Sequence, residues 1–312
     1  MAFVPRKATN LVIGLQTEKG TEAAGDLVKI PLPEGCKPPT VNPNYNFFQY
    51  GGGNYNLLQY ETGGVTVEGS MTLPLVPGYV APGVTNPFGQ WIWGRAEVED
   101  YYEGYYATVY VDRGNDLVEK FLDVKVKSGS AKVDYGANYA ALELQIEGLA
   151  MPASDTFTDP APDLFEVRPY RFSEATISVD LGSGYAAESY SRNHSLDFDN
   201  MCEKIEAVNG TVTAAAMPNS ELAQWKGSFD RAFFDADIYD AFIAGTEFAY
   251  KLVLARAGVA TATFEFPRCV LTGHSLDIPD KGMMKETGIG WQALGALDNS
   301  ADSFTITETL SS

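Results

Sequence analysis

Apolar and polar residues alternate along most of the chain, and glycine, proline and asparagine separate the alternating stretches. A period of two is typical of β-strands that bury one face. The clearest case is residues 141–149 (ALELQIEGL), where Glu143 and Glu147 share the polar face. Helical spacing is limited to residues 88–94 and 236–245. The pattern therefore predicts a mainly β protein with two short flanking helices.

The two halves of the chain contain similar sequence features in the same order. Residues 67–71 (VEGSM) and 225–229 (WKGSF) each open a strand that precedes one of the helical runs. Each helical run leads to a strand that ends at a glycine turn, Gly114 or Gly258, and then to a strand interrupted by glycine. A repeat of this length exceeds the roughly 20–50 residues of solenoid repeats. It predicts a duplicated domain.

The 312 residues are enough for two domains. The stretch 152–166 is rich in proline and aspartate and lacks periodicity, so we expect a linker between domains at 1–151 and 167–312. Residues 32–63 form a long connection in which 45–50 and 54–60 could pair as a hairpin around Gly51–Gly53, and 76–87 form a second loop. The expected strands are 10–16, 27–31, 65–75, 105–112, 119–128, 130–135, 140–149, 175–181, 190–200, 224–234, 248–256, 261–266, 269–278, 286–294 and 303–308.

The formal charge of the chain is −19. It argues against binding to nucleic-acid phosphates or to an anionic membrane surface, both of which require clustered basic residues. No stretch approaches the 18 apolar residues of a membrane span, and the first residues do not form a secretory signal. Cys36, Cys202 and Cys269 are isolated and odd in number, which favours reduced thiols in the cytoplasm.

Neither histidine belongs to a recognisable site motif. For His194 and His274 a solvent-facing strand position is favoured over a metal-binding or catalytic role. Residues 197–200 (DFDN) lack the glycine and glutamate of a calcium loop, so Asp197 and Asp199 are expected to face water while the neighbouring Leu196 and Phe198 face inward. We predict no catalytic, cofactor-binding or metal-binding residue.

Three further groups of residues have both a functional and a structural interpretation. The acidic run 97–103, with Glu97 and Glu103, could hold a glycosidase-like carboxylate pair but favours an exposed or intersubunit loop. Lys125, Lys127 and Lys132 form a basic stripe, for which pairing with acidic neighbours of another subunit is favoured over phosphate binding. Trp91 and Trp93 could stack on sugars, but their apolar surroundings favour core packing.

The second half resembles the major tail tube proteins of long-tailed bacteriophages. The similarity lies in residues 169–177 (PYRFSEATI) and 195–200 (SLDFDN), followed by an Asn-Gly turn, a Gly-Ser strand and the helical run 239–245. In the first half, residues 12–21 (VIGLQTEKGT) are similar to the N-terminal segment of such proteins. The resemblance implies a non-enzymatic virion protein with two tandem tail-tube-like β-sandwich or split-barrel domains, each with one flanking helix.

The resemblance also implies partners and a location. Three chains with two units each would form a pseudo-sixfold ring, and rings would stack into the hollow tail assembled in the host cytoplasm. The long segment 32–63, the 76–87 loop, the linker and the termini would supply ring-to-ring contacts. The tube would contact tape-measure and tail-tip or terminator proteins, would not contact a membrane, and would pass double-stranded DNA without binding it specifically. Three chains carry 57 formal negative charges, three times the 19 of one chain, which would repel DNA if they face the lumen.

Two other classes of function remain open. A duplicated β-sandwich could bind carbohydrate or a receptor through exposed tyrosine and tryptophan. A β-rich glycoside hydrolase would need a carboxylate pair in residues 97–103, and its activity would be lost in Glu97→Gln or Glu103→Gln.

Overall fold

The fold was analysed in a computed structural model. It describes residues 10–25, 27–31, 36–48, 59–81, 87–93, 105–112, 118–149, 153–155, 168–205, 214–218, 224–232, 234, 236–277, 284–295 and 303–310. The protein is mainly β, with two short α-helices in this part of the chain.

The described elements follow the same order in both halves of the chain. The first half contains β1 (Asn10–Leu15), β2 (Val28–Pro31), β3 (Lys37–Phe48), β4 (Gln59–Pro74), α1 (Pro87–Trp93), β5 (Ala107–Asp112), β6 (Val118–Asp134), β7 (Ala141–Gly148) and β8 (Ala153–Asp155). The second half contains β9 (Ala175–Asp180), β10 (Ala186–Ala187), β11 (Ser191–Asp199), β12 (Gln224–Arg231), α2 (Ala236–Ala244), β13 (Glu247–Arg256), β14 (Ala260–Asp277), β15 (Lys285–Ala293) and β16 (Thr305–Leu310). A 3-10 turn (Phe172–Glu174) precedes β9.

The strand pairings repeat together with the order. In the first half β1 pairs with β2 and β5, β3 with β4, β4 with β7, and β6 with β5, β7 and β8. In the second half β9 pairs with β10 and β13, β11 with β12, β12 with β15, and β14 with β13, β15 and β16. All of these pairings are antiparallel. The internal repeat predicted from the sequence is therefore present in the topology.

The registers of the two repeats share two of their shifts, and the second repeat has additional shifts, at Gly273–Ser275 in β14 and at Phe229–Arg231 in β12. The β6–β7 ladder shifts between Val126 and Ser128, and the β14–β15 ladder shifts between Leu271 and Gly273. A second shift separates Ala107 from Val109 in β5, and its counterpart separates Phe248 from Tyr250 in β13. Bulges bend a strand and set its twist. Bulges at these equivalent positions therefore bend β6 and β14 in a similar way as far as Gly273.

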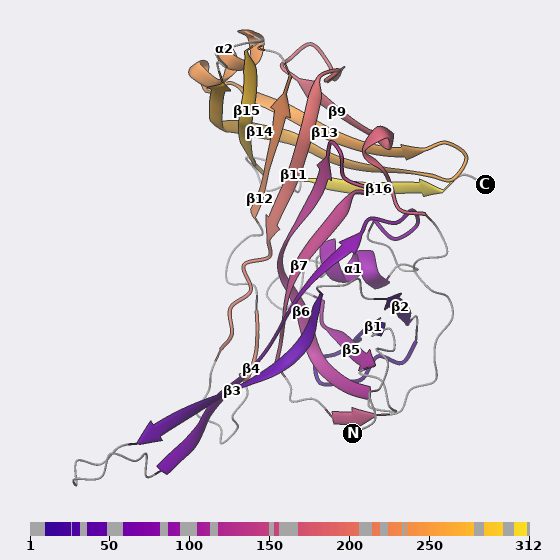
Figure 1. The fold of residues 1–312 in the computed structure, drawn as a ribbon, viewed down its shortest axis with the longest axis vertical. Coiled ribbons are helices and arrows are strands. Elements are labelled where there is room, and N and C mark those ends of the chain that lie inside the picture. The colour runs from indigo at the N-terminus through magenta and orange to yellow at the C-terminus, as the bar shows by residue number, and fades with distance from the viewer. Residues whose placement is uncertain are drawn as a thin grey trace.

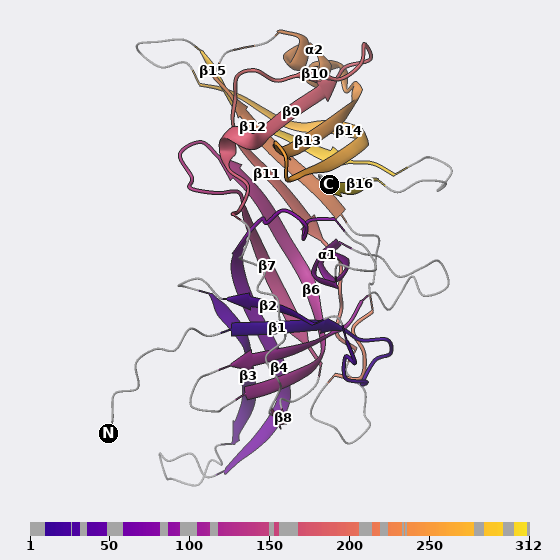
Figure 2. The same cartoon turned by 90° about the vertical axis from the view of Figure 1, so that its right-hand side faces the viewer.

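The two repeats belong to one open antiparallel sheet. Asn193–Asp199 of β11 pair with Ser128–Asp134 of β6, so a strand of the second half adds directly to the first half (Figure 1). Figure 2 shows the strands of the second half continuing beyond β6 and β7. The described start of the expected linker, residues 153–155, forms β8 and pairs with β6. Residues 156–167 lie outside the described part.

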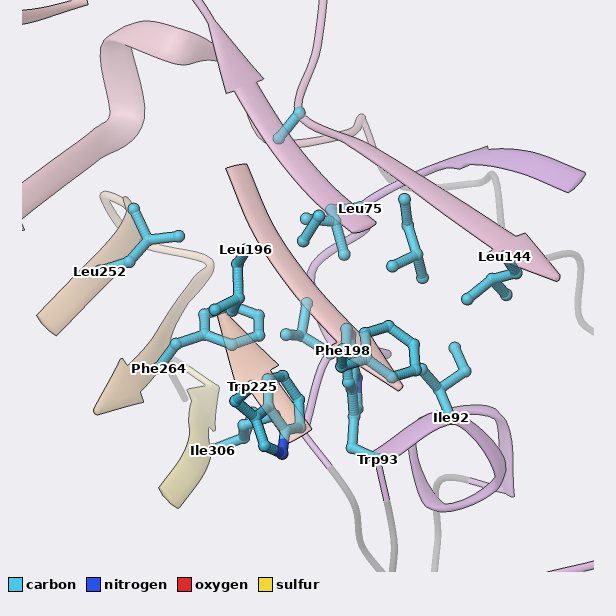
Figure 3. Close-up of a cluster of buried hydrophobic side chains, with 14 of the residues drawn as sticks. Leu75, Ile92, Trp93, Leu144, Leu196, Phe198, Trp225, Leu252, Phe264 and Ile306 are labelled. Carbon is cyan, nitrogen blue, oxygen red and sulfur yellow. The ribbon is translucent and has the colours of Figure 1, made fainter. Parts of the chain in front are cut away.

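One hydrophobic core runs through both halves. Leu75, Ile92, Trp93 and Leu144 come from the first half, and they lie beside Leu196, Phe198, Trp225, Leu252, Phe264 and Ile306 of the second (Figure 3). Burial of this apolar surface stabilises the joint between the halves as well as each half.

Two strand breaks expected from the sequence are wrong, because β6 and β14 are each continuous. Gly129, expected to interrupt β6, is a paired residue that leaves room for a neighbouring ring. In β14, Pro267 falls at the bulge opposite Ala249, a position where a missing ladder N–H is tolerated.

Residues 37–48 form the strand β3, of which residues 45–48 were expected in a hairpin and residues 37–44 in an irregular connection. The prolines of this segment lie at two register shifts of the β3–β4 ladder, between Lys37 and Thr40 and between Pro43 and Tyr45. Proline is accommodated at such irregularities and on edge strands. The glycines between the two strands, residues 51–53, lie outside the described residues, but the hairpin pairing that they suggested is present.

Candidate self-assembly interface

The joint between the repeats is built around a glycine. Phe198 of β11 lies opposite Gly129 of β6. A Cβ atom at position 129 would lie 2.5 Å from Cε1 of the Phe198 ring and 2.6 Å from the backbone oxygen of Glu143. Only glycine lets the Phe198 ring lie this close to β6, which explains why a glycine occurs inside a long strand.

Helix α1 supports the same joint from the first half. Its last residue, Trp93, has its ring centroid 4.8 Å from that of Phe198 and 5.6 Å from that of Trp225, which it stacks on. Trp93 also meets Phe264 edge-on at 5.8 Å. Aromatic pairs at these separations add to the free energy of apolar burial. A helix of one repeat thus packs on strands of the other (Figure 3).

The connection between β11 and β12 extends the joint along the first half. Its described residues Cys202 and Met217 form a small buried cluster with Tyr106 and Leu149. The ammonium of Lys125 is buried there and donates to the Met217 carbonyl at 2.9 Å. The joint therefore has three parts: a strand pairing, a helix that packs on the added strands, and a connection that covers the neighbouring repeat.

The basic stripe expected to pair between subunits pairs within the chain instead. Lys127 lies 2.7 Å from Glu147, and Lys132 lies 2.7 Å from Glu143. The hydrogen bond to Glu147 raises the pKa of Lys127. Residues at opposite or diagonal positions of adjacent strands can share a face of the sheet. The glutamates of β7 are therefore close partners of these β6 lysines.

His194 is buried and the side chain of His274 is 3% exposed, so the expectation of solvent-facing positions is wrong for each. Nε2 of His274 lies 2.7 Å from Oε1 of Glu286, whose side chain is 0% exposed. Arg231 lies 3.5 Å from the other oxygen of Glu286 and 2.9 Å from Glu188. The rings of Tyr239 and Phe242 in α2 pack against His274. These contacts hold α2 against the end of β14.

His194 packs on Tyr250, whose hydroxyl lies 2.8 Å from Nδ1. Burial lowers the pKa of His194 from 6.5 to about 3. Below pH 6.5 the unfolded chain therefore binds a proton that the folded chain does not bind until about pH 3. Folding stability falls as the pH decreases through this window.

His194→Gln is expected to remove this component of acid sensitivity, which amounts to about 1.4 kcal/mol per pH unit. Urea unfolding of both proteins at a series of pH values between 6.5 and 4 measures it. Parallel pH dependences for the two proteins would contradict the assignment.

The remaining candidate residues have structural roles. Leu196 and Phe198 are buried and Asp197 is exposed, as predicted, while Asp199 is half-buried and accepts the Met201 N–H. All four tryptophans of the chain, Trp91, Trp93, Trp225 and Trp291, are buried. The cysteines are unbridged, and burial raises the pKa of Cys269 to about 12. The acidic run 97–103 lies outside the described residues.

The described residues show few features of a small-molecule or metal-binding site. They contain no group of three or more potential metal ligands. A pocket of about 560 Å³ opens between α2 and the β9–β10 turn, and its lining includes Glu188, Asp237 and Asp240 but no aromatic residue. Neither described helix is long and apolar enough to cross a membrane.

Large apolar side chains are exposed around α2. Ile243 is 66% exposed, and Phe234, Tyr239, Leu276 and Met284 are also exposed. We call these five residues the α2 patch. Leu276 follows His274 on the same face of β14, and the α2 rings pack on His274, so the patch is centred on the contact between α2 and β14. Exposed apolar groups gathered in this way mark interaction surfaces.

The sequence alone did not reveal the joint, the buried ion network or the α2 patch. Two features of the sequence hinted at these contacts. Gly129 lies inside an alternating strand, and the chain has two histidines in all. Comparison with protein-family models and with curated proteins found no match.

Proposed function

We propose that the chain is the major tail tube subunit of a long-tailed bacteriophage, a structural protein that assembles into stacked rings around a DNA channel. The observation that carries this proposal is the joint between the repeats. Strand β11 of one repeat adds to β6 of an equivalent repeat, through different surfaces of the two. Such a heterologous contact generates rings or filaments when it recurs between chains. The resemblance of residues 169–177 and 195–200 to tail tube proteins supplies the specific identity.

The finer architecture belongs to the same proposal. Each repeat would act as one tail-tube-like domain, and three chains would supply six equivalent positions. The charge of −19 per chain supports a wall that repels DNA rather than binding it, because phosphate contacts slow sliding. Tape-measure and tail-tip or terminator proteins would bind the ends of the tube, and the assembled protein would reside in the virion tail.

A carbohydrate- or receptor-binding module is the second candidate. Burial of all four tryptophans removes them as stacking platforms, and the pocket beside α2 presents carboxylates instead of rings. An enzymatic role would depend on Glu97 and Glu103, and Glu97→Gln and Glu103→Gln would test it.

Electron microscopy of the purified chain over a range of concentrations, with mass measurement of the same samples, tests the main proposal. We expect hollow rings or tubes and masses in multiples of three chains. Dispersed particles at every concentration, together with glycan-dependent thermal stabilisation, would favour the binding module instead.

A further inference from the structure

We propose that β3 of one copy pairs with the edge of β14 at residues 271–277 of the next copy, repeating between chains the joint that β11 makes with β6 within one chain. This inference rests on the proposed function for its biological setting. It names the two surfaces that meet when copies of this chain assemble.

The strands that pair with β6 lie on its two edges. Val124 pairs with Ala107 of β5 and with Gly148 of β7, so β5 and β7 lie on opposite edges. Residues 128–132 pair with both β7 and β11, so β11 lies opposite β7 as well. One edge of β6 therefore carries β5 along its first part and β11 along its last part.

The same edge of β14 is only half used. Strand β13 pairs with residues 260–270 of β14 and corresponds to β5. On the opposite edge, β16 and β15 together extend to Asp277. Beyond Val270, the edge that carries β13 has no partner strand among the described residues, although its counterpart in β6 is fully occupied. Exposed ladder groups of this kind pair readily with a strand of another chain.

The strand that corresponds to β11 is β3, and among the described strands it pairs with β4 alone. Both strands form a hairpin with the strand that precedes the helix, β4 or β12. The connection after β11 lies against the neighbouring repeat through Cys202 and Met217. The β3–β4 hairpin instead projects away from the rest of the molecule (Figure 1). Beyond the β4–β7 ladder, which begins at Val67, the described tip of this hairpin has two strands, and a two-stranded hairpin is marginally stable in water, so the tip favours a docking partner.

The α2 patch points to the same place independently. Helix α1 covers the joint within the chain, where Trp93 packs on strands of the second half. Helix α2 occupies the equivalent position beside β14, but Ile243 at its end is 66% exposed. Strands of a second copy, added at residues 271–277, would bury the α2 patch as β11 and β12 bury Trp93.

The matching registers predict which residues meet. Asp197 and Asp199 of β11 lie opposite Ser130 and Ser128 of β6. Asp197 corresponds to Thr40, because they pair with the equivalent residues Lys226 and Glu68. Ser130 corresponds to Ser275 when β14 is counted from Gly273, the counterpart of Ser128, across the additional register shift of the β14–β15 ladder. Thr40 of one copy is therefore expected opposite Ser275 of the next.

Disulfide trapping tests this register. Thr40→Cys and Ser275→Cys are introduced into separate chains, both with Cys36→Ser, and the two proteins are mixed and oxidised. Opposite residues of an antiparallel pair have Cα atoms about 4.5–5.5 Å apart, which a disulfide spans. We expect a product of twice the chain mass, in which mass spectrometry of peptides joins positions 40 and 275.

Thr261→Cys replaces Ser275→Cys in the matched control. Thr261 is also exposed and lies in the same strand, but β13 and β16 occupy both edges there. Equal yields from positions 261 and 275 would overturn the pairing. Each single variant oxidised alone reports any product in which identical positions are joined.

Ile243→Glu provides a second measurement that does not depend on oxidation. We expect it to abolish assembly while leaving the thermal unfolding of the single chain unchanged. Leu310→Glu, at a residue 62% exposed on β16, should assemble normally. Unimpaired assembly of Ile243→Glu would overturn the role of the α2 patch.

The outcomes separate the two proposals. Tubes without a 40–275 disulfide would overturn the pairing and leave the tail tube function standing. A 40–275 disulfide in open chains, without hollow rings, would support the pairing and count against the tube. Absence of both self-association and the disulfide would overturn both.

Discussion

Arg231→Met is expected to lower the free energy of unfolding by about 3–5 kcal/mol, the usual cost of leaving a buried charge without its partner. Arg231 is 8% exposed, and its guanidinium lies between Glu188 and the fully buried Glu286. Among the described residues, its loss would leave Glu286 with His274 as partner, so the buried carboxylate would have less compensation for its desolvation. Urea unfolding at neutral pH measures the change.

The matched control is Arg268→Met. Arg268 also contacts a glutamate, Glu247, at 2.8 Å, but the glutamate side chain is 51% exposed. Water solvates this pair when it is broken, and surface ion pairs contribute little to stability. We therefore expect little change. Similar losses of unfolding free energy in the two variants would show that burial does not determine how much the Arg231 network contributes to stability.

A further variant separates the charge from the packing. Arg231→Met combined with Glu286→Gln removes the buried charge as well as its partner. We expect the double variant to be more stable than Arg231→Met alone, because a neutral amide is cheaper to bury than an unpaired carboxylate. No recovery would contradict an electrostatic origin of the loss.

Gly129→Ala is expected to destabilise the protein by about 1–3 kcal/mol through overpacking at the joint between the repeats. The added methyl group would lie 2.5 Å from the Phe198 ring and 2.6 Å from the Glu143 backbone oxygen. The ring can move by changing its rotamer, but the oxygen belongs to the β7 ladder and cannot shift without disturbing the β6–β7 pairing. Thermal and urea unfolding would both report the loss.

Gly25→Ala serves as the comparison, since a Cβ atom there meets nothing within 4 Å. Phe198→Leu in the Gly129→Ala background should recover part of the loss, because the smaller side chain relieves one of the two contacts. Strict additivity of the two substitutions would indicate that residues 129 and 198 do not interact.

The local pattern predicted much of the fold, because alternation and glycine turns act over a few residues. The helices at 88–94 and 236–245 are confirmed as α1 and α2, and the order of elements in the repeat is confirmed by the pairings. The first part of β3, residues 37–44, was missed because its prolines normally exclude a strand, and their placement at bulges becomes visible only with β4 alongside.

The predictions that failed depend on contacts distant in the sequence. His274 was expected to face water because no neighbour in the sequence suggests a partner, but Glu286 reaches it from the adjacent strand β15. Lys132 was expected to pair with an acidic residue of another subunit, but its partner is Glu143 of the adjacent strand β7. A period-two pattern shows which residues share a face of one strand, but it does not show which strand lies next to it.

The joint between β6 and β11 also bears on the entropy of assembly. Because one chain carries two repeats, half of the contacts in a six-repeat ring would already be made on folding, at the effective concentration of a covalently linked neighbour. Only three bodies, rather than six, would lose translational and rotational freedom on closure. Each remaining contact could then be individually weak and reversible, which allows a misplaced chain to leave before the ring closes.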